Sequence, residues 1–175
     1  MRWKRTAQGQ SQPVDRHPVG PGQESVWDYP RPPALERSDE QVEVVLGGVV
    51  IASTRACLRV LETSHPPTYY LPIAAFAQGS VRRAEGGSWC EWKGQARYFD
   101  LIGGDVVAHR CAWGYPTPSE RFSRLLDHLA LYPAAVDEAR VDGTPVRPQP
   151  GDFYGGWITD RVVGPFKGVP GSTGW

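Results

Sequence analysis

VEVVLGGVVIAST, residues 42–54, consists of two runs of apolar and β-branched residues on either side of Gly47-Gly48. Valine, isoleucine and threonine favour extended strands, whereas paired glycines adopt the positive φ angles that a two-residue turn requires. The stretch therefore predicts a hairpin of two antiparallel strands, 42–46 and 49–54.

The same signals recur along the chain. Two strand-like segments, 96–101 and 105–113, flank Gly103-Gly104 and predict a second hairpin. Further segments have the composition of strands or turns: 68–71 as a strand, 72–76 as a helical turn and Asp142-Gly143 as a turn. Residues 57–62 fit a helix or a strand, and the neighbouring strands favour a strand. Because strands outnumber helices, the predicted fold class is mainly β, with one or two short helices.

One helix has a clear start signal. Thr117, Pro118 and Glu120 have the spacing of a capping box with proline at the first helical position. Apolar residues then recur at helical spacing up to Pro133. The spacing predicts a helix beginning at Thr117, although its last residues, 129–132, fit an extended chain equally well.

The last twenty-three residues, 153–175, read FYGGWITDRVVGPFKGVPGSTGW. Five aromatic rings are uncommon in a disordered tail, and the many glycines and prolines are incompatible with a regular helix or strand. We expect an ordered, irregular segment that shapes a surface or a pocket. Residues 25–175 are then one domain, and the polar, basic residues 1–24 are a flexible arm or, as an alternative, a contact for RNA or a partner.

Composition limits the classes of function. The chain has 175 residues, with 19 Lys plus Arg and 19 Asp plus Glu, so its net charge gives no sign of binding to duplex nucleic acid or to a membrane. No apolar run has the length of a membrane span, and no CxxC pair indicates zinc. Three widely spaced cysteines fit a reducing compartment, so we expect a soluble, cytoplasmic protein. The sequence predicts neither a cofactor nor an oligomeric state.

Five blocks together resemble one known family. They are ESVWDYPRPP (24–33), VLETSHPPTYYLP (60–72), CEWKGQARYFDL (90–101), AWGYPTP (112–118) and the segment 153–175. In order and content they are similar to the domain-of-unknown-function family numbered 427, over about residues 22–175. The resemblance implies a compact β-tent fold like that of Mss4-like proteins, without the zinc-binding CxxC pairs that many β-tent proteins carry. The family is sometimes labelled nucleotidyltransferase-like.

Three side chains in these blocks are candidate catalytic residues. Lys93, three residues after Cys90, could lower the pKa of the thiol and make it a nucleophile; the alternative is a buried cysteine beside a surface lysine. Glu62 could act as a general base or hold a ligand, or could cap the turn that follows it. His65, in the same turn, is interpreted as a turn residue.

The remaining candidates would bind a ligand rather than react with it. Rings with polar tips suit a pocket for a planar or sugar-like molecule, with core packing as the alternative for each ring. These rings are Tyr70, Trp92, Tyr98, Trp113, Tyr115, Tyr154 and Trp157. Lys167, in a Gly-Pro-Phe-Lys-Gly turn, could help to hold an anion or could belong to a closing turn.

The leading hypothesis is therefore a pocket for a small polar or anionic ligand, with or without catalysis. Nucleotidyl transfer is a second hypothesis that the family label alone supports, because the chain lacks both a paired-carboxylate metal motif and a phosphate loop. A protein-binding module is a third hypothesis, and a thiol-dependent reductase is a fourth.

Overall fold

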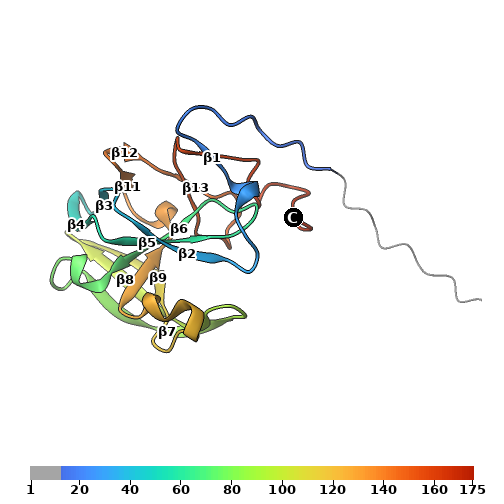
Figure 1. The fold of residues 1–175 in the computed structure, drawn as a ribbon. Helices are drawn as coiled ribbons and strands as arrows, with labels where there is room; N and C mark the ends of the chain where they lie inside the picture. The colour runs from blue at the N-terminus through green and yellow to red at the C-terminus, as the bar shows by residue number, and fades with distance from the viewer. Residues whose placement is uncertain (1–12) are drawn as a thin grey trace, which may run out of the picture.

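The computed structural model describes residues 13–175 of the chain, and it confirms a mainly β fold (Figure 1). The larger sheet has seven strands in the order β2 (Ala34–Ser38), β5 (Cys57–Leu61), β6 (Thr68–Pro72), β10 (His128–Leu131), β9 (Val106–Gly114), β8 (Gly94–Gly103) and β7 (Val81–Cys90). The smaller sheet has four strands in the order β12 (Thr144–Pro145), β11 (Glu138–Val141), β3 (Val42–Leu46) and β4 (Val49–Thr54).

Short elements complete the fold. Two strand pairs join the terminal segments, β1 (Glu24–Ser25) with β15 (Val162–Val163) and β13 (Arg147–Pro148) with β14 (Trp157–Ile158). In the described part of the chain the helical segments are all of the 3-10 type: η1 (Val26–Asp28), η2 (Ile73–Ala75), η3 (Glu120–Leu125) and η4 (Pro133–Ala135). No helix within residues 13–175 is both long and apolar enough to cross a membrane.

The hairpin expected at residues 42–54 is confirmed. Strands β3 and β4 pair from Val42 opposite Thr54 to Leu46 opposite Val49, and both glycines of the turn have positive φ, 59° and 74°. The turn packs directly on the second predicted hairpin, β8–β9, because a Cβ atom on Gly47 would lie 1.9 Å from the carbonyl oxygen of Gly103. Glycine thus serves both the turn geometry and the close contact of the two hairpins.

The main core lies between the two sheets. Every second residue of β3 is buried, as expected for a strand with one face against a core. These residues pack with side chains from the larger sheet, including Leu101 and Leu131, and with Trp157 from the C-terminal segment. A second cluster, which includes Tyr70, Tyr115 and Phe122, lies near η3 and borders the pocket described below.

The predicted helix at Thr117 is wrong in its start, type and length. A 3-10 helix covers only Glu120–Leu125, its N-cap is Ser119, and no side chain caps it. The alternative of an extended chain near residues 129–132 is confirmed: β10 begins at His128 and pairs with β6 on one side and β9 on the other in the larger sheet. Pairing on both sides satisfies the backbone of β10, and this overrides the helical spacing of its leucines.

The described part of the N-terminal arm lies against the C-terminal segment. The backbone N–H of His17 donates to the carbonyl of Gly164, and the Gln23 amide donates to the carbonyl of Asp160. Glu24 and Ser25 then form the parallel pair with β15. Residues 1–12 lie outside the described residues, so the flexible arm expected there stays a prediction.

Candidate functional site

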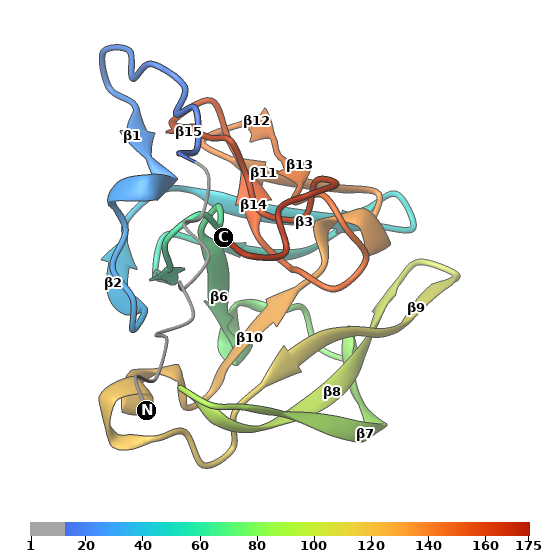
Figure 2. The same cartoon turned by 90° about the vertical axis from the view of Figure 1, so that its right-hand side faces the viewer.

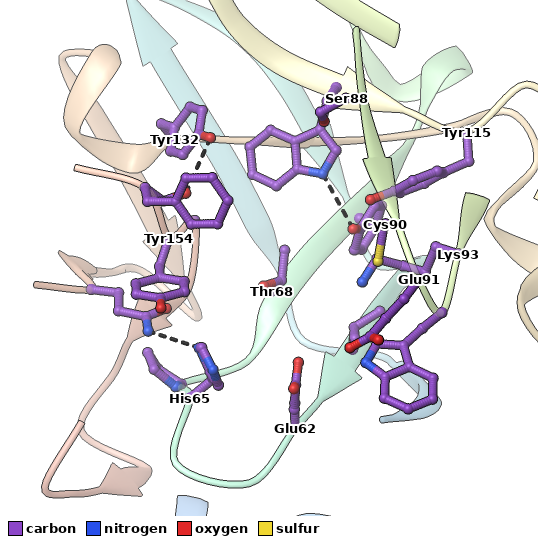
Figure 3. A pocket seen from close by; sticks show the side chains of 18 of the residues that line it. Glu62, His65, Thr68, Ser88, Cys90, Glu91, Lys93, Tyr115, Tyr132 and Tyr154 are labelled. Atoms are coloured by element: carbon purple, nitrogen blue, oxygen red, sulfur yellow. Dashed lines mark hydrogen bonds between the residues drawn. The ribbon is translucent and has the colours of Figure 1, made fainter. Parts of the chain in front are cut away.

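A pocket of about 550 Å³ opens where four parts of the chain meet. These parts are the turn between β5 and β6, the turn between β7 and β8, the ends of β9 and β10, and the C-terminal segment (Figures 2 and 3). Its lining residues are Val60, Glu62, His65, Pro66, Thr68, Tyr70, Ser88, Trp89, Cys90, Glu91, Trp92, Lys93, Tyr98, Trp113, Tyr115, Tyr132, Gln149, Phe153, Tyr154, Gly155 and Lys167. The structure therefore gathers ten of the eleven predicted site residues around one hollow.

The β7–β8 turn carries Cys90 and Lys93 into this pocket. Gly94 has a φ of 104°, which a residue with a side chain rarely adopts, and it allows the chain to reverse directly after Lys93. Ser119 fixes the turn from outside, because its backbone N–H donates to the carbonyl of Lys93 and its hydroxyl donates to the carbonyl of Trp92. Figure 3 shows the thiol, the ammonium group and the Tyr115 hydroxyl pointing to the same side of the pocket.

The Lys93 ammonium lies against aromatic rings. Its Nζ atom is 5.9 Å from the centre of the Tyr115 ring and 5.8 Å from that of Phe122, within the range of a cation–π contact. Among the described residues, no oxygen or nitrogen atom accepts a hydrogen bond from Nζ, and no carboxylate forms a salt bridge with it. Nζ is nevertheless not a buried atom without a partner, so it is accessible from the pocket that Lys93 lines. The ammonium is thus a partly buried cation that faces the pocket.

The charge of Lys93 is kept at neutral pH. Burial alone would lower its pKa, but the neighbouring Tyr70, Cys90 and Glu62 groups outweigh burial and raise the pKa above its usual value. Burial raises the pKa of the Tyr70 and Tyr115 hydroxyls, so both phenols are neutral. This part of the pocket therefore presents a positive charge beside two neutral hydroxyl groups.

Aromatic side chains form one wall of the pocket. The Trp113 indole N–H donates to the Tyr70 hydroxyl at 3.3 Å, and the Trp113 and Tyr132 rings lie 4.7 Å apart. The Trp113 ring also packs on Gly155, where a Cβ atom would lie 2.2 Å from Trp113 Cη2. The guanidinium of Arg110 covers the Tyr98 ring at 4.9 Å. These contacts hold the wall rigid, which suits the recognition of a planar molecule.

Glu62 lines the pocket from the β5–β6 turn. Its Oε1 atom is 3.3 Å from Nε of Arg31, and its side chain is 26 % exposed. The carboxylate is thus partly neutralised from outside the pocket, while Figure 3 shows it directed inward. In this position it can accept a hydrogen bond from a hydroxyl or amine group.

His65 and Gln149 form a polar pair that the sequence interpretation did not include in the site. The Gln149 amide lies 2.9 Å from Nδ1 of His65, and the imidazole packs edge-on against the Tyr154 ring at 4.9 Å. Burial, together with the positive charges of Lys167 and Arg31, lowers the pKa of His65 to about 4. His65 is therefore neutral at pH 7.

Of the predicted ligand-binding residues, Trp157 differs from the expectation, and Lys167 lines the pocket with its ammonium already paired. Trp157 is fully buried in the main core and stacks on Tyr69 at 5.0 Å, so its assignment to the pocket is wrong. Its indole N–H donates to the carbonyl of Leu131, which satisfies its one polar group within the protein. Lys167 does line the pocket, but its ammonium donates to the backbone oxygen of Trp175 at 2.8 Å.

Within residues 13–175, no group of three or more His, Cys, Asp or Glu side chains is placed to hold a metal ion. All three cysteines are free thiols, and burial raises the pKa of Cys57 to about 12 and that of Cys111 to about 11. Only Cys90 of the three lies at the pocket.

The fold and the site together define a mainly β protein with an aromatic pocket that contains a charged lysine. The sequence model of the family described as "Domain of unknown function (DUF427)" matches residues 34–142, more than half of the chain, and the chain belongs to this family. No curated protein matches the sequence. The matched span ends before Gln149, Tyr154 and Lys167, so the C-terminal wall of the pocket lies beyond it.

Proposed function

We propose that the pocket binds a small organic anion that has a planar ring, with the anionic group on Lys93 and the ring against the aromatic wall. The observation that carries this proposal is the Lys93 ammonium, which faces the pocket without a carboxylate partner among the described residues. An unpaired, partly buried charge is costly, and an anionic ligand would supply the missing counter-charge.

The rings support the second half of the proposal. Trp92, Tyr98, Trp113 and Tyr115 line the same hollow as Lys93, and a pocket of this volume suits a molecule of the size of a nucleoside or an aromatic acid. The ring of a ligand would replace water on these faces, and stacking would orient it. Polar groups on the ligand would then be limited to its ends.

Glu62 and Cys90 would contact the two ends of this ligand. The Glu62 carboxylate would accept a hydrogen bond from a hydroxyl or amine group, and the Cys90 thiol would lie next to the anionic group because it neighbours Lys93. Both residues keep the catalytic roles predicted from the sequence as proposals. The ligand-binding step is the part that the geometry supports best.

The test compares anions with neutral molecules of the same shape. Binding of benzoate and benzamide, and of uridine monophosphate and uridine, is measured by calorimetry for the wild type, Lys93→Met and Arg83→Met. Arg83→Met is the matched control, because Arg83 is an exposed cation of β7 that lies outside the pocket. Thermal melting of each variant verifies that it is folded.

We expect at least one anion to bind more tightly than its neutral counterpart. Lys93→Met should lower the affinity for that anion at least tenfold, whereas Arg83→Met should not. A tenfold loss corresponds to about 1.4 kcal/mol, a modest value for a charge-assisted hydrogen bond. Equal binding of anion and neutral molecule, equal affinity of the two variants, or binding by none of the four compounds would contradict the proposal.

A further inference from the structure

The orientation of the Gln149 amide is fixed by contacts on both of its ends. Its oxygen accepts from the backbone N–H of Gly156 at 3.1 Å, and its nitrogen donates to the carbonyl of Lys167 at 2.9 Å. A flipped amide would place two donors against each other at Gly156 and two acceptors at Lys167. The nitrogen of Gln149 must therefore also be the atom that faces His65.

This orientation fixes the tautomer of His65. Because the Gln149 nitrogen is a donor, Nδ1 of His65 must accept and has no proton of its own. The proton of the neutral imidazole is then on Nε2. Nε2 has no hydrogen-bond partner among the described residues. Within them, only two side-chain atoms are both buried and without a partner, Arg59 Nε and Ser64 Oγ, so Nε2 is not buried. The Nε2–H group therefore reaches open space at the pocket.

We propose that His65 is a ligand-recognition residue whose Nε2–H donates a hydrogen bond to an oxygen acceptor at the end of the ligand away from Lys93. Figure 3 shows His65 and Lys93 on opposite sides of the pocket, with Thr68 between them. The inference rests on the proposed function and narrows the ligand class to an organic anion with a second acceptor, such as a carbonyl or carboxylate oxygen, across its ring.

The contacts of His65 favour recognition over proton transfer. The ring is held by the Gln149 amide on one side and by Tyr154 on another, so its donor has a fixed direction. The charged groups that shift its pKa, Lys167, Arg31 and Lys93, are all cations that oppose its protonation. A neutral donor beside these cations is suited to an acceptor oxygen and not to a ligand amine.

The first test reads the tautomer directly. Nitrogen NMR at pH 7, with the His65 signals assigned by their loss in His65→Phe, should show a protonated Nε2 and an unprotonated Nδ1. Phenylalanine keeps a ring against Tyr154, so this variant should stay folded. A signal for protonated Nδ1 would overturn the inference, whatever the ligand.

The second test uses two probes of similar shape, 4-acetylbenzoate, which has a carbonyl acceptor across its ring from the carboxylate, and 4-isopropylbenzoate, which has none. A longer pair, the corresponding phenylacetates, covers a greater span of the pocket. In at least one pair the wild type should prefer the acetyl compound about three- to tenfold, the effect of one net hydrogen bond. His65→Phe should abolish this preference, whereas His65→Gln, which retains an N–H donor, should restore part of it.

The outcomes separate the two proposals. If both probes of each pair bind through Lys93 but His65→Phe leaves their ratio unchanged, the role of His65 is refuted and the proposed function stands. If the acetyl preference depends on His65 while Lys93→Met has no effect on affinity, the role of His65 is supported and the proposed function fails.

Discussion

At the scale of single residues, the groups around each side chain of the pocket decide, together with burial, whether it carries charge. Lys93 and His65 line the same hollow, but neighbouring groups keep the first charged and the second neutral. The neighbours of Lys93 are hydroxyl, thiol and carboxylate groups, whereas those of His65 include three cations. Burial lowers the pKa of both groups, and the different neighbours give the opposite net results.

The lowered pKa of His65 makes the protein sensitive to acid. The usual histidine pKa of 6.5 applies to the unfolded chain, and the folded value is about 4, so between these two values the unfolded state binds more protons. Stability contributed by neutral His65 is fully present above pH 6.5 and is lost as the pH falls toward 4. We expect the wild type to lose about 1–2 kcal/mol more than His65→Phe between pH 7 and pH 5.

Urea unfolding of the two proteins at both pH values measures this difference. His17→Phe is the matched control, because it makes the same substitution at a histidine that is exposed and lies outside the pocket. Parallel loss of stability in the wild type and His65→Phe would show that His65 is not held neutral by the fold.

Lys93, Cys90 and Glu62 line the pocket as the sequence predicted, but the sequence pattern favoured a turn residue for His65, and the reason is physical. The role proposed for His65 depends on Gln149, which is 84 positions away in the chain, and no local pattern connects the two residues. Trp157 was predicted at the pocket but lies in the core. A ring in a glycine-rich segment suits either place equally, and only its packing on Tyr69 shows which one it occupies.

At the scale of elements, the C-terminal segment shapes the pocket through its glycines. Gly155 allows the Trp113 ring to approach the backbone, and Gly156 lies against Pro66 and the Gln149 amide. These contacts explain why the segment is irregular and yet ordered, as its composition predicted.

The predicted hairpins were also correct, because paired glycines determine such turns locally. The predicted helix failed because strand pairing with β6 and β9 is not visible in local spacing.

Gly155→Ala tests this function of the segment. The added methyl group would displace the Trp113 ring, weaken its hydrogen bond to Tyr70 and cost about 1–3 kcal/mol of stability by overpacking. Gly174→Ala is the control, because a Cβ atom there meets nothing within 4 Å and its φ is not positive. Denaturant unfolding should separate the two variants; equal stability would mean that the Trp113 wall tolerates displacement.

At the scale of the whole molecule, the folded unit extends beyond the span that the family model matches. That span is 34–142, but Trp157 lies in the main core and β15 pairs with β1. The terminal segments thus contribute to the same core and to the same pocket as the matched region.

A pair of aromatic truncations measures this contribution. Trp157→Ala removes a fully buried ring and should lower the free energy of unfolding by about 3–5 kcal/mol. Phe153→Ala removes a ring that is 80 % exposed and should change stability by less than about 0.5 kcal/mol. Similar losses of stability for the two variants in a denaturant titration would show that the C-terminal segment does not unfold together with the main core.

The most direct measurement of the central claim is a crystal structure of the protein with the tightest-binding of the tested anions. We expect the anionic group within hydrogen-bond distance of the Lys93 Nζ atom, with the ring of the ligand against Trp113 and Tyr98. A ligand seated elsewhere on the protein, or one whose anionic group points to solvent and away from Lys93, would contradict it.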